Sequence, residues 1–108
     1  MKIKTALREY LVEIEVRKYT PKTVRSYRNN LNLFLRFCEE EEGIENVEDV
    51  ALSTVRRFSM FFSSKGKKGS YINGLLKTAK SFIQYCHDEG YGCFNKKRIS
   101  NGVKKIKP

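Results

Sequence analysis

The sequence is poor in the residues that build most metal and redox sites. Its 108 residues include one histidine, His87, and three cysteines, Cys38, Cys86 and Cys93, with no Cys-x-x-Cys pair. Because zinc sites use paired ligands at short spacings, we expect no metal and no other cofactor. Cys38 and Cys86 fall on apolar helical faces, where we expect reduced, buried thiols in a reducing compartment.

Long apolar runs are also missing. No stretch approaches the ~20 apolar residues that a membrane span needs, and the first five residues lead into mixed charges where a signal peptide has its apolar core. These features predict a cytoplasmic protein with no membrane partner. The apolar fraction of 40% is sufficient for one folded domain, since single domains most often contain about 100–150 residues.

Acidic residues are absent from residues 51–85, which contain seven bases, whereas residues 39–50 contain seven acids and no base. We interpret residues 39–50 as a solvated acidic loop, because four adjacent glutamates point in different directions. The net charge is +10 and the pI is about 9.7. Such an excess can simply keep a chain soluble, but its segregation along the chain favours a polyanionic partner, with nucleic acid as the first candidate.

Patterns that indicate catalysis are missing as well. General acid–base chemistry needs positioned titratable groups, yet the acids cluster in one segment and His87 lies at the end of a predicted helix, where we expect a structural or surface role. Gly66 and Gly69 lack the spacing and the strand-to-helix context of a phosphate-binding loop. The sequence therefore predicts a binding module and no enzyme.

Apolar residues recur at three- and four-residue steps in four segments, which we predict to be helices at residues 5–18, 21–41, 54–64 and 70–88. Their N-caps are expected at Thr5, Thr20, Ser53 and Ser70. The second start is the sharpest, because Pro21 follows Thr20 at the first helical position. No strand pattern is evident. We predict one all-α domain over residues 1–94, followed by a basic linker at 95–108.

Two of these helices combine an apolar face with an outer face of basic and short polar side chains. Helical geometry places Lys22, Arg25, Ser26, Asn29 and Arg36 opposite the apolar stripe of the second helix, and Ser70, Asn73, Lys77 and Lys80 opposite or beside that of the fourth. Lysine and arginine bind phosphates or guanine, and asparagine can pair with adenine. This mixture favours DNA, although each single lysine can equally be an ordinary solvated residue.

Two segments resemble a SAM-like domain, the N-terminal core-binding domain of tyrosine recombinases of the phage integrase family. The first is Tyr19-Thr-Pro-Lys-Thr-Val-Arg-Ser-Tyr-Arg-Asn-Asn-Leu-Asn-Leu-Phe-Leu-Arg-Phe37, which is similar to the pattern s-x-x-T-x-x-x-Y-x-x-x-L-x-x-F-x-x-F. The second is Ser70-Tyr-Ile-Asn-Gly-Leu-Leu-Lys-Thr-Ala-Lys-Ser-Phe-Ile-Gln-Tyr85, which is similar to the fourth helix of that domain. The likeness covers about residues 5–95.

The resemblance implies an orthogonal bundle of four or five helices that forms half of a clamp around double-stranded DNA at a recombination half-site. DNA contacts carried over onto this chain are Thr20, Lys22, Thr23, Arg25, Ser26 and Asn29, then Ser70, Tyr71, Asn73, Lys77 and Lys80, with Lys65, Lys67 and Lys68 reaching phosphates. The family's tyrosine nucleophile belongs to a C-terminal catalytic domain that we expect in a longer protein, after Pro108. That domain and other recombinase protomers on DNA are the further partners implied.

The chain departs from the family pattern where Lys96, in place of proline, follows Asn95, and where the acidic run after the second helix is longer than expected. Two other functions stay open. A stand-alone DNA-binding regulator would place a helix-turn-helix across the Lys65–Gly69 link. A helical protein-interaction domain would instead expose an apolar patch.

Overall fold

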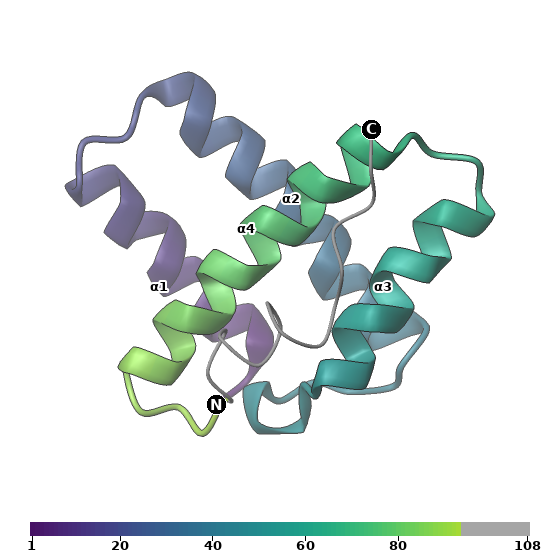
Figure 1. The fold of residues 1–108 in the computed structure, drawn as a ribbon. Helices are drawn as coiled ribbons and strands as arrows, with labels where there is room; N and C mark the ends of the chain where they lie inside the picture. The colour runs from purple at the N-terminus through teal and green to yellow at the C-terminus, as the bar shows by residue number, and fades with distance from the viewer. Residues whose placement is uncertain (94–108) are drawn as a thin grey trace.

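The computed structural model describes residues 1–93 and contains four α-helices (Figure 1). They are α1 (Ile3–Val16), α2 (Pro21–Glu40), α3 (Leu52–Ser64) and α4 (Gly69–Asp88), with a short 3-10 turn, η1 (Val47–Asp49). The predicted all-α class is confirmed, because no strand occurs between residues 1 and 93 and the only β contact there is an isolated bridge from Lys2 to Asn46. The predicted linker at 95–108 lies outside the described residues.

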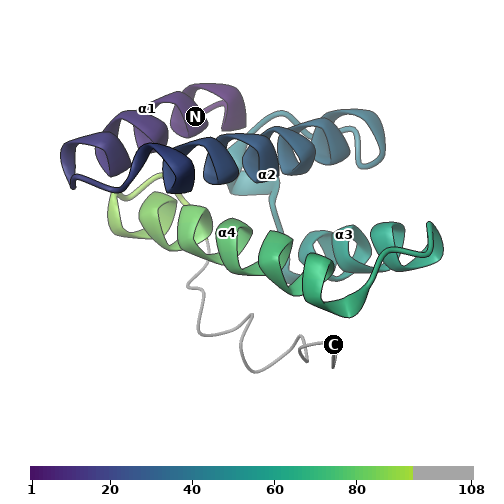
Figure 2. The same ribbon diagram turned by 90° about the horizontal axis from the view of Figure 1, so that it is seen from above.

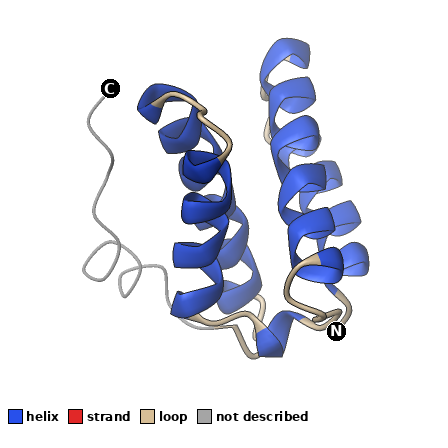
Figure 3. Cartoon of the chain, turned by 90° about the vertical axis from the view of Figure 1, so that its right-hand side faces the viewer, coloured by secondary structure: helices blue, strands red, loops and turns tan. Residues whose placement is uncertain are grey.

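The helices form two hairpins, α1 with α2 and α3 with α4, that pack against each other. In Figure 1, α4 crosses in front of α2, and α1 and α3 flank this crossing. Seen from the side in Figure 3, the two hairpins form two columns, which the segment containing η1 connects at one end. Helices α2 and α4 make the most extensive contact between any two elements, so their crossing is the centre of the fold.

Aromatic side chains fill the space around the crossing. Phe34 of α2 and Phe58 of α3 are buried with their ring centroids 5.1 Å apart. Towards the other end, Tyr10 of α1 packs on Phe82 and Tyr85 of α4 at centroid distances of 5.8 and 5.0 Å. One aromatic cluster joins α1, α2 and α4 and the other joins α2, α3 and α4, so both help to fix how α2 and α4 cross.

Only one of the four predicted N-caps is correct. The Thr20 side chain accepts a hydrogen bond from the Thr23 N–H at 3.2 Å and caps α2. Thr5 caps nothing, because α1 begins at Ile3, whose N–H donates to the distant Glu45 carbonyl at 2.8 Å. The prediction of Ser53 as a cap is also wrong. Helix α3 begins at Leu52, and the Thr54 hydroxyl accepts a hydrogen bond from the Ala51 N–H at 3.1 Å.

Ser70, too, is not a cap. Helix α4 begins one residue earlier, at Gly69, and its N-cap is Lys68, whose side chain makes no capping hydrogen bond. Ser70 is therefore an exposed residue of the first helical turn. Its hydroxyl is available to an external partner because no backbone N–H of the helix start uses it.

The acidic segment is more ordered than the solvated loop that we predicted. Its first residues belong to α2, and Val47 and Val50 are buried in the core around η1. The Glu42 side chain is only 12% exposed, because the Arg57 guanidinium of α3 binds it through Nε and Nη2. Charge in this segment therefore holds α3 against the end of α2 and is only partly solvated.

None of the three cysteines is in a disulfide and all are buried, as expected for Cys38 and Cys86. Removal from water disfavours a thiolate, so burial raises the pKa of Cys38 to about 12, and nearby Glu42 and Glu39 act in the same direction. Burial likewise raises the pKa of the Cys86 thiol. These groups are packing residues with the reactivity of a protonated thiol.

Candidate nucleic-acid interface

A polar link joins α2 and α4 at their crossing. The Asn30 side-chain amide donates a hydrogen bond of 3.1 Å to the Thr78 hydroxyl, which in turn donates to the Gly74 carbonyl at 3.1 Å. Thr78 is only 3% exposed, and Asn30 is half-buried. This link defines the crossing line between the helices, which we call the α2–α4 seam (Asn30, Gly74 and Thr78).

The predicted residues of α2 lie on its solvent side, towards its N-terminal half. Five of them are exposed, namely Thr20, Lys22, Arg25, Ser26 and Asn29. Thr23 is half-buried, and its hydroxyl accepts a hydrogen bond of 2.9 Å from the Thr20 hydroxyl. Because Ser26 precedes Asn30 by one helical turn, this face continues directly into the seam.

Of the predicted residues of α4, Ser70 and Lys77 lie on the same side of the helix as Gly74 of the seam. Ser70, Tyr71 and Lys77 are exposed, whereas Asn73 and Lys80 are half-buried. Lys77 immediately precedes Thr78, and Ser70 precedes Gly74 by one turn. In Figure 2, the N-terminal ends of α2 and α4 lie at opposite ends of the molecule.

The link between α3 and α4 carries three exposed lysines, Lys65, Lys67 and Lys68. The Lys65 ammonium lies 4.5 Å from the Phe61 ring centroid, and that of Lys67 lies 5.7 Å from the Tyr71 ring centroid. Such cation–π contacts hold a lysine near a surface while leaving N–H donors for phosphate. These lysines therefore extend the α4 face beyond its N-terminus.

Some bases of the described chain are paired with glutamates and others are not. Four arginines form ion pairs with glutamates: Arg17 with Glu13, Arg28 with Glu15, Arg36 with Glu40 and Arg57 with Glu42. Within residues 1–93, no carboxylate forms an ion pair with Lys22, Arg25, Lys65, Lys67, Lys68 or Lys77. These six bases are among the residues predicted to contact DNA, and their charge, like that of Lys2, Lys4, Arg8 and Lys18 in and beside α1, is available to an external anion.

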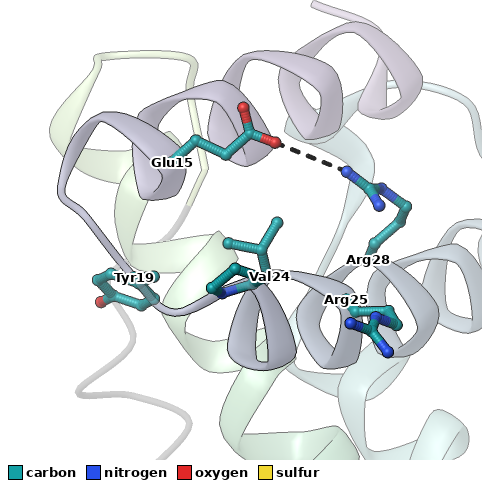
Figure 4. Close-up of a pocket in the computed structure, with 6 residues that line it drawn as sticks. Glu15, Tyr19, Val24, Arg25 and Arg28 are labelled. Carbon is teal, nitrogen blue, oxygen red and sulfur yellow. Dashed lines mark ion pairs between the residues drawn. The ribbon is translucent and has the colours of Figure 1, made fainter.

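The hollow in Figure 4, at the turn between α1 and α2, is lined by one paired and one unpaired arginine. It has a volume of about 380 Å³ and is lined by Glu15, Tyr19, Pro21, Val24, Arg25 and Arg28. The Arg28 guanidinium lies 3.7 Å from the Glu15 carboxylate across the hollow, whereas Arg25 lies at its rim. Two arginines less than one helical turn apart thus differ: one is neutralised within the protein and the other is presented outward.

Sequence reasoning missed the seam itself. Asn30 and Thr78 were not among the predicted contacts, and neither was Gly74. Their signal was present, because Asn30 and Thr78 are polar residues beside the apolar stripes of α2 and α4. Periodicity cannot show, however, that residues 48 positions apart are hydrogen-bonded.

Among residues 1–93, no group of histidine, cysteine and acidic side chains is arranged to hold a metal ion. No helix there has both the length and the apolar character that a membrane span requires. His87 lies with Nδ1 2.9 Å from the Cys93 carbonyl oxygen, a contact that orients the ring beside the end of α4.

Comparison with known proteins identifies the domain. Residues 7–90 match the family model of the phage integrase N-terminal SAM-like domain, so the chain belongs to this family. The tyrosine recombinase XerC of Oceanobacillus iheyensis is 31% identical over 83 residues, which are 77% of this chain and 26% of that protein. The chain thus spans about a quarter of the recombinase that it matches, and it holds the N-terminal SAM-like domain and not the catalytic domain. No solved structure matches it significantly.

Proposed function

We propose that this chain binds double-stranded DNA with sequence selectivity, as the core-binding domain of a site-specific tyrosine recombinase that acts in DNA integration and recombination. The observation that carries the proposal is the segregation of charge on the folded chain. Six bases without an ion pair lie with short polar side chains on α2, on α4 and on the link before α4, whereas four arginines of the described chain are paired with glutamates. Long-range attraction and counterion release then favour a polyanion on that side.

The residue types on these faces support duplex DNA over a generic anion. Lys22, Arg25 and Lys77 provide cations for phosphates or guanine, and Asn29 provides the donor and acceptor pair that matches adenine. An α-helix fits the major groove, and two helices that cross can address successive parts of one site. The domain therefore positions a recombinase on its half-site, while strand cleavage belongs to the catalytic domain of the complete protein.

Charge reversal on both helices tests this proposal. We expect Arg25→Glu combined with Lys77→Glu to leave the helical circular-dichroism signal intact and to abolish binding to a short mixed-sequence duplex in fluorescence anisotropy. The matched control is Lys4→Glu with Arg8→Glu, which causes the same change in net charge at exposed positions of α1. The control should retain most of the affinity. Equal losses from both pairs would show attraction by net charge without a defined face, and unchanged affinity of the first pair would refute the site.

Sequence selectivity needs a separate measurement. Selection from a randomised duplex library should enrich one half-site motif if the asparagines and serines read bases. If no motif is recovered, the proposed function is non-specific DNA binding.

We further propose that the protein acts in the cytoplasm. Its proposed partners, besides DNA, are the catalytic domain of the complete protein and other protomers on the same DNA.

A further inference from the structure

Gly74 is unusual among the glycines of the described chain. Gly43, Gly66, Gly90 and Gly92 have φ values between 65° and 83°, a backbone region that favours glycine. Gly74 instead lies in the interior of α4, with helical backbone. Glycine weakens a helix at such a position relative to alanine, because it loses more backbone freedom on folding. Its backbone conformation therefore does not explain why glycine is there.

Packing within the chain does not explain it either. A Cβ built on Gly74 would meet no atom within 4 Å of the described residues, and the residue is exposed. Its carbonyl accepts the Thr78 hydroxyl at 3.1 Å, but any residue with a backbone carbonyl can do so. The folded domain alone thus has room for a side chain at this position.

The location of Gly74 suggests what uses this space. It lies in the α2–α4 seam, one turn after Ser70 and one turn before Thr78, whose hydroxyl connects the Gly74 carbonyl to the Asn30 side chain of α2. The unpaired Lys77 is on the same side of α4. A glycine lets an external partner approach the backbone more closely than any other residue does.

We infer that bound duplex DNA approaches α4 most closely at Gly74, and that the missing side chain makes room for the DNA backbone between the two helices. This inference rests on the proposed function and locates the contact within it. Lys77, which lies on the same side of α4 as Gly74, then binds a phosphate beside the seam. Side-chain bulk at position 74 must block DNA without harming the fold.

The test measures stability and DNA affinity on the same variants. Gly74→Ala and Gly74→Leu should both raise the thermal midpoint in circular-dichroism melts, because the space is open and both residues favour helix more than glycine does. Gly74→Leu should weaken duplex binding in fluorescence anisotropy by about tenfold or more, and Gly74→Ala by less. Thr5→Leu, at an exposed position of α1, is the control for a new apolar side chain and should bind as the wild type does.

The outcomes separate this inference from the proposed function. If the wild-type chain binds DNA and Gly74→Leu binds within twofold of it, the inference is overturned while the proposed function stands. If the wild-type chain does not bind duplex DNA at low salt, both fail. If leucine at position 74 lowers the thermal midpoint, the open space is occupied in the fold and the inference is again overturned. A selective loss of affinity in a stable Gly74→Leu supports it.

Discussion

The Asn30 side chain of α2 and the Thr78 hydroxyl of α4 share a hydrogen bond of 3.1 Å at the point where the two helices cross. Thr78 is buried and Asn30 is half-buried, and a polar group removed from water is favourable only when it is hydrogen-bonded. Thr78 also donates to the Gly74 carbonyl, so the three residues form a directional chain of bonds. Apolar packing tolerates sliding between helices, whereas this link favours one register. It thereby sets the relative position of the two outer faces.

Removal of the link should cost stability. We expect Asn30→Ala to lower the free energy of unfolding by about 1 kcal/mol, the usual contribution of one protein hydrogen bond. Denaturant unfolding followed by circular dichroism measures this change. Asn32→Ala, at an exposed position on the same helix, is the matched control and should change stability by less than about 0.5 kcal/mol.

A double-mutant cycle then isolates the pair. Thr78→Val keeps the side-chain shape but removes the hydroxyl, and its combination with Asn30→Ala should cost less than the sum of the single changes by about 0.5–1.5 kcal/mol. Strict additivity would mean that the hydrogen bond does not couple the helices energetically.

The lysines before α4 should act through phosphates alone. We expect Lys67→Gln to weaken binding to all duplex sequences alike and to reduce the slope of log affinity against log salt by about 1. Anisotropy titrations at several salt concentrations measure both effects. Lys4→Gln on α1 should leave the slope unchanged, and a similar reduction there would assign the effect to net charge.

Asn29 should contribute to the recognition of a particular DNA sequence. Its exposed amide lies on the outer face of α2 beside Arg25, where it can pair with a base edge. We expect Asn29→Ala to reduce discrimination between the selected half-site and a scrambled duplex while leaving affinity for the scrambled duplex nearly unchanged. Competition binding with the two duplexes measures this ratio. An equal loss on both would make Asn29 a phosphate contact.

Helix register was predictable from the sequence, and helix starts were not. The stripe that contains Leu31 and Phe34 identifies the buried face of α2 because apolar spacing follows the helical repeat. The start of α1 depends on the Glu45 carbonyl, more than 40 residues away, which binds the Ile3 N–H. The two outer faces were likewise visible in the pattern, but their meeting at Asn30 and Thr78 depends on packing between distant segments.

The Arg57–Glu42 pair shows that ion pairs between distant segments were not predictable from the sequence either. From the sequence, Glu42 belongs to an acidic run that looks solvated, because nothing adjacent neutralises it. In the fold, Arg57 reaches it from α3 across 15 positions, and their hydrogen bond raises the pKa of the arginine. Composition therefore predicts that the molecule is basic overall, but only the fold separates paired bases from those that face outward.

Burial of Cys38 should make stability fall in alkaline solution. The pKa of this thiol is raised to about 12 in the folded chain, whereas the pKa of a thiol in an unfolded chain is about 8.5. The stabilisation is fully present below the unfolded value and is lost as pH rises towards the folded one. Between the two, this group alone contributes a decrease of at most about 1.4 kcal/mol per pH unit. Chemical denaturation at pH 8–10.5 should show a shallower decrease for Cys38→Ala than for the wild type, and identical slopes would contradict the assignment.

The salt dependence of duplex binding tests the central claim most directly, because a face that neutralises phosphates must release counterions. Anisotropy titrations of the wild-type domain with duplex DNA over a series of salt concentrations give the slope of log affinity against log salt. With about five phosphate contacts from the α2 and α4 faces, we predict a slope near −4 to −5. An affinity that hardly changes with salt would contradict the account.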